Sequence, residues 1–234
     1  MKVGIVIIVY NIDTAIFLLQ LAAIKKYCTD DFEINIFDNS STEEYAAAIK
    51  YHSEQQRVNY TRAKSSQATG SDSHSFCANL SYLLLKNRYK YFFYLDHDCI
   101  PVSYFSVTAA VGYNFIYAGI GQKEVNTYLW PGCFMFNNDK INKDLIDFSP
   151  SHELGLDTGG GLHKIVSEYG KDQGIFFKEE YFQNPEFHDK LYGHYAIIQD
   201  TFMHFIGASN WMGIEKNQER INSLISIVKE KTQL

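Results

Sequence analysis

The chain alternates short apolar runs with amphipathic segments, and this alternation is typical of an α/β protein. Residues 3–9 form a continuous run rich in β-branched side chains, which predicts a strand covered on both faces. Residues 33–37 predict a second strand. Because each strand is followed by a helical segment, we expect a mostly parallel central sheet flanked by helices and joined by right-handed crossovers.

The first two helical segments begin at polar residues that can act as caps. Asp13 or Thr14 can cap the first helix, which is expected to end near Tyr27. Ser41 and Glu44 have the spacing of a capping box at the start of the second helix. The inner side of the first helix is expected to hold four apolar side chains, those of Leu18, Leu21, Ala22 and Ile24.

The next stretch predicts a short strand, a loop and a helix. Residues 57–60 form the strand, and residues 63–73 are rich in Ser, Thr, Gln and Gly, which indicates a loop over the sheet. A helix is expected from Asp72 to about Lys86. We place four large apolar side chains on its inner side, those of Phe76, Leu80, Leu83 and Leu84.

Residues 91–95 are aromatic or aliphatic without helical spacing, so they predict a central strand buried on both faces. The strand is expected to end at Asp96 and Asp98, and Pro101 opposes its continuation. Since alternate strand residues point to the same side, the two carboxylates would converge while His97 faces away. Two oxygen ligands of this kind suit Mg²⁺ or Mn²⁺ and a phosphorylated substrate. A solvated turn after the strand is the alternative interpretation.

The pattern beyond Pro101 is less regular. Its predicted elements are strands at 117–120 and 133–136, a turn at 137–139, a flexible loop at 156–161 and a helix at 162–169. Residues 174–182 and 194–206 fit either strands or loops. A C-terminal helix is expected to pack one apolar stripe on the same domain, formed by Ile214, Ile221, Leu224, Ile225 and Val228.

Composition narrows the class of protein. The 234 residues suffice for one domain with a large core, and no repeat or low-complexity linker divides them. A net charge of -6 argues against a nucleic-acid partner, although a bound metal would still allow a phosphate-bearing ligand. The four cysteines form no C-x-x-C pair, and no window supplies eighteen apolar residues, so we expect a reduced, cytoplasmic protein.

Polar groups at three predicted strand ends occur in a recognisable order. They are Val9-Tyr10-Asn11, Asp38-Asn39-Ser40 and Asp96-His97-Asp98. Later segments extend the pattern, namely residues 73–79, 130–136, 156–159 and 203–209. The ordered set resembles the GT-A fold glycosyltransferases, most closely the bacterial family 2 type, over residues 3 to about 211.

The resemblance implies roles for particular residues. Val9, Tyr10, Asn11 and Asp38 would surround the nucleotide base, and Asp96 would contact the ribose or a metal-bound water. The metal, Mn²⁺ or Mg²⁺, would be bound by Asp96, Asp98 and His204. Asp157 would be the catalytic base, and the remaining substrate contacts would come from His74, Asn79, Trp130 and Gly132. Two departures stand out, because Ala78 replaces the usual arginine before Asn79 and Asp157 is the only acid where the family often has a pair.

The resemblance also implies a reaction and a division of the single domain, residues 1–234. Residues 1–101 would bind the nucleotide, residues 102–211 would hold the acceptor and catalytic groups, and residues 212–234 would form the C-terminal helix. The expected reaction is metal-dependent transfer of a sugar from a nucleotide-diphosphate donor, UDP-linked by preference, to a hydroxyl of a glycan or lipid-linked acceptor, with inversion. Such an acceptor allows peripheral association with the inner face of a membrane.

Each of these residues has a structural alternative. Asp38 and Asp157 are also suited to capping or turn positions, and His204 to a hydrogen-bonded place in the core. His74 and Asn79 would then cap a helix or face solvent, and Trp130 would be a core side chain. Two other functions also stay open: a haloacid-dehalogenase-like phosphatase, which uses a D-x-D after an apolar strand, and a sugar-nucleotide-binding protein without catalysis.

Overall fold

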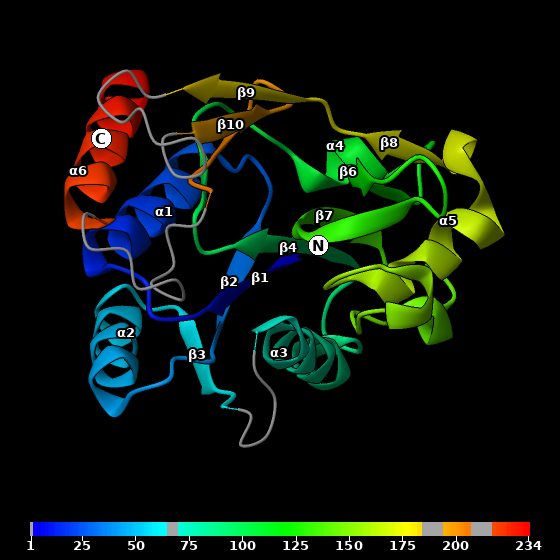
Figure 1. Ribbon diagram of the computed structural model, residues 1–234, viewed down its shortest axis with the longest axis horizontal. Coiled ribbons are helices and arrows are strands. Elements are labelled where there is room, and N and C mark those ends of the chain that lie inside the picture. The colour runs from blue at the N-terminus through cyan, green and yellow to red at the C-terminus, as the bar shows by residue number, and fades with distance from the viewer. Residues whose placement is uncertain (1, 65–69, 184–193, 207–216) are drawn as a thin grey trace.

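The computed structural model describes residues 2–64, 70–183, 194–206 and 217–234. These ranges form two β-sheets covered by helices (Figure 1). The strands of the larger, central sheet are β1 (Val3–Val9), β2 (Phe32–Asp38), β3 (Asn59–Arg62), β4 (Tyr91–Asp96), β6 (Tyr117–Gln122), β7 (Tyr128–Asn137) and β8 (Gly174–Phe176). Those of the smaller sheet are β5 (Cys99–Pro101), β9 (Glu179–Gln183), β10 (His194–Ile198) and β11 (Phe202–His204).

The helices alternate with the strands in the first half of the chain. They are α1 (Thr14–Tyr27), α2 (Glu43–Gln55), α3 (Gly70–Leu85), α4 (Val107–Val111), α5 (His163–Tyr169) and α6 (Asn217–Thr232). Short 3₁₀ turns occur at Lys143–Leu145, His152–Leu154, Gly160–Leu162 and Lys171–Gln173. None of the helices in the described ranges combines the length and apolar character needed to cross a bilayer.

The central sheet confirms the predicted mostly parallel α/β architecture. Its strand order is β3-β2-β1-β4-β7-β6-β8, and β1 pairs in parallel with both β2 and β4. β7 is the exception, because it runs antiparallel between β4 and β6. The first residues of β7 therefore lie at the same edge of the sheet as the last residues of β1 and β4.

Both faces of the central sheet are covered, as the apolar run at residues 3–9 predicts. Ile5 and Ile7 belong to a core cluster with α1, α4, α6 and the smaller sheet, whereas Val6 and Ile8 belong to a cluster with α3 and α5. α6 lies beside α1 (Figure 1), and Tyr27 donates a hydrogen bond to the Thr232 carbonyl. The stripe of Ile221, Leu224, Ile225 and Val228 is buried there as predicted, and Ile214 lies outside the described residues.

The helix caps were predicted in part. Asp13 caps α1, and its side chain accepts a hydrogen bond from the Ala15 backbone N–H. The capping box at Ser41 is wrong, because Thr42 caps α2 and the Ser41 side chain binds Asn11 instead. The buried face of α1 includes Leu21 and Ile24 but not Ala22, which is exposed.

The predicted inner face of α3 is also wrong. Phe76, Leu83 and Leu84 are 45%, 62% and 54% exposed, and Leu80 is half-buried. The residues that face the sheet are mostly small: Ser73, Ser75, Cys77, Ala78, Ser81, Tyr82 and Leu85. Small side chains fit because the sheet itself supplies the bulk, through the stacked rings of Phe92, Tyr94, Phe134 and Phe136.

The chain reverses immediately after the central strand. β4 ends at Asp96, residues 97–98 form a turn, and Cys99 begins β5 in the smaller sheet. We had expected Pro101 to stop a strand, but it is part of β5. It is tolerated there because β5 is the edge strand of its sheet, where a missing N–H costs little. Residues 174–182 and 194–206, which the pattern left open, supply β8 to β11.

Candidate functional site

The ends of β1 and β2 are joined by polar contacts. Val9 pairs with Asp38, and its carbonyl accepts a hydrogen bond of 2.8 Å from the Asn39 N–H. The following Asn11 has a left-handed φ of 45°, which asparagine tolerates better than most residues. Its side-chain oxygen accepts a hydrogen bond of 2.9 Å from the Ser41 N–H. These contacts fix the loop that the resemblance assigns to the nucleotide base.

The carboxylate of Asp38 is fully buried and has several partners. It accepts hydrogen bonds from the Ser40 N–H at 2.8 Å and from the Tyr60 hydroxyl at 2.7 Å. Arg62 adds an ion pair at 3.6 Å and donates to the Ser40 carbonyl. Burial and the hydrogen bond to Asp38 raise the pKa of Tyr60, so its hydroxyl stays a donor to the carboxylate. The buried Asp38 carboxylate thus holds together residues 40, 60 and 62 at this strand end.

Asp96 is paired with a histidine from α3. The His74 Nε2 lies 3.0 Å from Asp96 Oδ1. Burial alone would lower the pKa of His74, but the charge and hydrogen bond of Asp96 outweigh it, and the pKa is raised. Burial would likewise raise the pKa of Asp96, but the charge and hydrogen bond of His74 hold it below its usual value. The two shifts act in the same sense, since each stabilises the charged form of its group in the pair.

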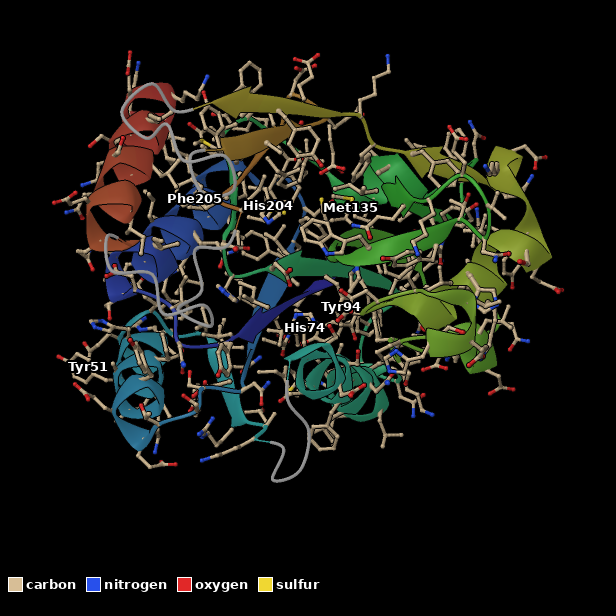
Figure 2. All side chains as sticks on the ribbon, viewed as in Figure 1. Tyr51, His74, Tyr94, Met135, His204 and Phe205 are labelled. Atoms are coloured by element: carbon tan, nitrogen blue, oxygen red, sulfur yellow. The ribbon has the colours of Figure 1, made fainter. Side chains whose placement is uncertain are left out.

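Asp98 has a different partner, on the other side of the central sheet (Figure 2). His204 Nε2 lies 3.6 Å from Asp98 Oδ1, and both side chains are largely buried. The strand ends at Asp96, so Asp98 lies in the turn that follows, and the two carboxylates pair with different histidines. His97 directs its Nδ1 to β1, where it lies 2.9 Å from the Ile8 carbonyl.

Two side chains, Asp98 and His204, have the donor atoms and proximity to bind one divalent ion. No group of three or more metal-binding side chains occurs in the described ranges. A Mg²⁺ or Mn²⁺ ion commonly has few protein ligands and completes its shell with water and substrate phosphates. The residues present therefore fit a metal that binds together with a diphosphate. Of the predicted segment 203–209, residues 207–209 lie outside the described residues.

A cavity of about 170 Å³ brings several predicted site residues together. It is lined by His74, Asp96, Gln122, Tyr128, Trp130, Asp157 and Thr158. The side chains come from α3, the end of β4, both strands of the β6–β7 hairpin and the loop before α5. The described lining does not include the predicted base contacts, which lie at the ends of β1 and β2.

Three residues of this lining were not predicted. Tyr128 donates a hydrogen bond to the Gln122 side chain across the hairpin. Burial, followed by the charge of Asp157, raises the pKa of Tyr128, so its hydroxyl remains protonated. Thr158 donates to the Ser71 carbonyl at 3.4 Å, which connects the Asp157 loop to the start of α3. The only sequence signal for Thr158 is its position beside Asp157.

Trp130 lies at the centre of the site. Its ring centroid is 4.8 Å from that of His204, so the indole borders both the cavity and the Asp98–His204 pair. Gly132 makes room for this ring, because a Cβ at residue 132 would lie 2.1 Å from the indole Cζ2. The structure thus gives Gly132 a packing role toward Trp130.

The Asp157 side chain is exposed, and its loop is held by hydrogen bonds to residues 148–149. Its Oδ1 accepts a hydrogen bond of 2.8 Å from the Thr158 N–H. The Gly159 N–H donates to the Phe148 carbonyl, and Gly159 has a φ of 84°, which favours glycine. A Cβ at Gly159 would also lie 2.5 Å from the Pro131 ring.

Asn79 supports this loop and does not line the cavity. Its Oδ1 accepts a hydrogen bond of 3.0 Å from the Phe148 N–H, and its Nδ2 donates to Ser149 Oγ at 3.1 Å. Both ends of the amide are therefore used by the segment to which the Asp157 loop is bonded.

Comparison with known proteins supports the fold. No model of a known protein family and no curated protein matches the chain. Among solved structures, it is similar to a mannosyltransferase from Pyrobaculum calidifontis in complex with GDP-mannose and Mn²⁺, with a TM-score of 0.51 and 13% sequence identity. The match covers 74% of this chain and 54% of that one. The chain therefore shares a Rossmann-like fold with a nucleotide-sugar glycosyltransferase, while spanning about half of its length.

Proposed function

We propose that this protein is a metal-dependent glycosyltransferase. It would move a sugar from a nucleotide-diphosphate donor to a hydroxyl of a glycan or lipid-linked acceptor, with inversion at the anomeric carbon. The observation that carries the proposal is the cavity in which His74, Asp96, Trp130 and Asp157 meet, next to the Asp98–His204 pair. The shared fold with a glycosyltransferase is independent support.

The roles of the residues follow from their positions. Asp98 and His204 would bind the divalent ion, which supplies Lewis-acid neutralisation of the diphosphate leaving group. Trp130 would stack on the face of the donor sugar. Asp157, exposed in the lining of the cavity, would accept the proton of the attacking hydroxyl. His74 would hold Asp96 in place through the contact of 3.0 Å between Nε2 and Oδ1.

The two parts of the proposed site correspond to two parts of the chain. Residues 1–101 would bind the nucleotide at the ends of β1, β2 and β4, and residues 102–211 would bind the acceptor. Residues 212–234 would serve as a packing helix. We propose a UDP-linked donor, and a GDP-linked donor is the first alternative because the similar structure contains GDP-mannose. With a lipid-linked acceptor, the protein would act at the cytoplasmic face of a membrane.

A thermal-shift panel of UDP-, GDP-, CMP- and dTDP-sugars with and without Mn²⁺ tests the proposal. One donor is expected to raise the melting temperature in the presence of Mn²⁺, because ligands that bind only the folded state stabilise it. Stabilisation by none of the donors would contradict the proposed function.

A matched pair of variants separates catalysis from binding. Asp157→Asn is expected to keep the donor-dependent shift while donor hydrolysis or transfer falls by roughly 10² or more, as for loss of a general base. Asp200→Asn is the control, since Asp200 is also exposed and its left-handed φ of 52° suits asparagine. Equal turnover in both variants would show that Asp157 is not the base, whereas donor binding without turnover in the unchanged protein would favour a sugar-nucleotide-binding protein without catalysis.

A further inference from the structure

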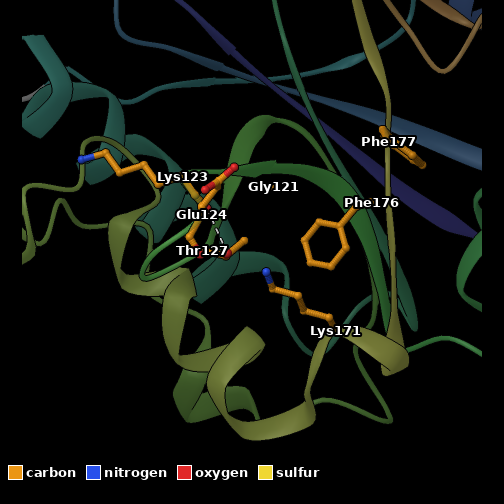
Figure 3. Close-up of a pocket in the computed structure, with 7 residues that line it drawn as sticks. All are labelled: Gly121, Lys123, Glu124, Thr127, Lys171, Phe176 and Phe177. Carbon is orange, nitrogen blue, oxygen red and sulfur yellow. Dashed lines mark hydrogen bonds between the residues drawn. The ribbon is translucent and has the colours of Figure 1, made fainter.

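A second cavity lies on the other face of the β6–β7 hairpin. Its volume is about 320 Å³, and it is lined by Gly121, Lys123, Glu124, Thr127, Lys171, Phe176 and Phe177 (Figure 3). Gln122 and Tyr128 line the candidate active site, whereas their neighbours in the chain, Gly121 and Thr127, border this second cavity. Because successive side chains of a strand alternate between faces, the hairpin forms a wall shared by the two cavities.

Aromatic side chains form the apolar part of this cavity. Phe176 is half-buried, and its ring lies against the backbone of β6 at Gly121. A Cβ at residue 121 would be 2.5 Å from the ring's Cδ1, so any other residue there would displace the ring. Tyr117 supports Phe176 from the core, with ring centroids 6.0 Å apart. The glycine and the tyrosine thus fix an aromatic ring at the edge of an open hollow.

Charged and polar side chains of both signs form the rest of the lining. Lys171 and Glu124 are exposed, and neither makes an ion pair with another described residue. Figure 3 shows the Lys171 chain running below the Phe176 ring toward Thr127. The Thr127 hydroxyl donates to the Lys123 carbonyl at 2.9 Å, which leaves its oxygen free to accept. This set offers an ammonium donor, a carboxylate acceptor and a hydroxyl around an apolar ring.

We propose that this cavity binds a hexopyranose unit of the acceptor glycan, at a distance from the unit that reacts. One face of a pyranose carries C–H groups that pack on an aromatic ring, and its hydroxyls bind carboxylate, ammonium and hydroxyl groups. Opposite charges in the lining disfavour a polyanion such as a nucleotide diphosphate. The volume lies at the lower end of the range for small-molecule sites, which fits a single sugar.

The second cavity is physically connected to the loop of the candidate base. Lys123, in its lining, donates a hydrogen bond through Nζ to the Gly155 carbonyl, two residues before Asp157. A sugar bound between Lys171 and the hairpin would therefore be held by the same hairpin that contacts the Asp157 loop. This inference rests on the proposed function, in that it assigns the sugar to the acceptor of that reaction.

Titration of the whole protein with simple sugars, followed by NMR, tests the inference. The probes are methyl α-mannoside, methyl α-glucoside and N-acetylglucosamine at millimolar concentrations. At least one is expected to shift the signals of Thr127 and Phe176. Lys171→Ala is expected to weaken this binding by about threefold and Phe176→Leu by about tenfold, in proportion to one polar contact and one stacked ring. No shift at these signals with any of the three sugars would overturn the inference.

A nearby lysine provides the control. Lys178 is exposed and does not line the cavity, so Lys178→Ala should bind the sugars as the unchanged protein does. Equal sugar binding by Lys171→Ala, Phe176→Leu and Lys178→Ala would also overturn the inference. The donor thermal-shift panel is run on the same variants. Donor binding without sugar binding would refute the subsite alone, whereas sugar binding without donor binding would refute the proposed function alone.

Discussion

The imidazole of His74 holds Asp96 through a contact of 3.0 Å between Nε2 and Oδ1. This contact joins α3 to the end of the central strand, and it leaves His74 Nδ1 buried without a partner among the described residues. Since His74 also lines the candidate cavity, the pair is both a structural connection and part of the site.

Replacing His74 should therefore affect stability and binding together. His74→Ala leaves a carboxylate that has lost its partner, and we expect a loss of about 1–3 kcal/mol in the free energy of unfolding. His74→Gln retains a donor and should recover part of it. Denaturant unfolding of the three proteins measures the difference. An alanine variant as stable as the unchanged protein would show that the contact contributes nothing.

Asn79 should act through Asp157. Asn79→Ala removes both hydrogen bonds to residues 148–149 and loosens the segment that holds the Asp157 loop, so turnover should fall by about tenfold through lost orientation. The donor-dependent thermal shift should not change, because Asn79 does not border the cavity.

The double variant isolates this dependence. In an Asp157→Asn background, Asn79→Ala should cause no further loss of turnover, because residues that act as a unit are not additive. A second tenfold loss in that background would mean that Asn79 acts independently of Asp157.

Gly132 should be intolerant of even one added methyl group. Gly132→Ala places a Cβ where the Trp130 ring now lies, so the indole must move. We expect a change in tryptophan fluorescence, a stability loss of about 1–3 kcal/mol from overpacking and weaker donor binding. Gly70→Ala is the contrast for fluorescence, because no atom of a described residue lies within 4 Å of an added Cβ there, and its left-handed φ of 56° would strain alanine without touching Trp130. Unchanged fluorescence in Gly132→Ala would refute the packing role.

Removal of metal ligands should abolish the Mn²⁺-dependent part of donor binding. Asp98→Asn and His204→Ala each delete one of the two proposed ligands, and chelation of Mn²⁺ removes the ion itself. All three treatments should reduce the donor-dependent rise in melting temperature to the value seen without Mn²⁺. If both variants retained the full rise, the ion would have to be bound elsewhere.

The central sheet could be predicted because its strands are covered on both faces. Such strands appear in sequence as continuous apolar runs, as in residues 3–9 and 91–95, and the order of strands and helices then favours parallel pairing. The smaller sheet could not be predicted in the same way. β5 and β11 have three residues each, and β5 follows so closely on Asp98 that its sequence suggests a turn.

The polar residues at the strand ends predict part of the site, but they do not predict the residues that the β6–β7 hairpin contributes. Asp96 follows an apolar run that is easily recognised, and Trp130 was placed only by resemblance. Gln122 and Tyr128 were not predicted, because β6 and β7 extend beyond their apolar centres and both residues lie outside the predicted strands. The pairing between them depends on antiparallel register, which no local pattern specifies.

Two substitutions on α3 test whether its small residues, and not its leucines, face the sheet. Leu83→Lys changes a side chain that already faces water, so its effect on stability should lie within about 0.5 kcal/mol. Ser81→Leu forces bulk against Tyr94, whose hydroxyl is 3.0 Å from Ser81 Oγ, and should cost about 1–3 kcal/mol. Thermal unfolding of the two variants checks the ranking, which would be opposite if the leucine face were the buried one.

The outward leucines and phenylalanine of α3 have a consequence for the protein at high concentration. These exposed apolar side chains bury little surface on folding and favour self-association. Replacing them should therefore reduce self-association without altering the native packing. Charged residues at positions 76, 83 and 84 would be expected to suppress self-association during purification while the aromatic layer beneath the helix stays intact. The exposed positions of α3 should therefore accept polar substitutions independently of the buried positions on the same helix.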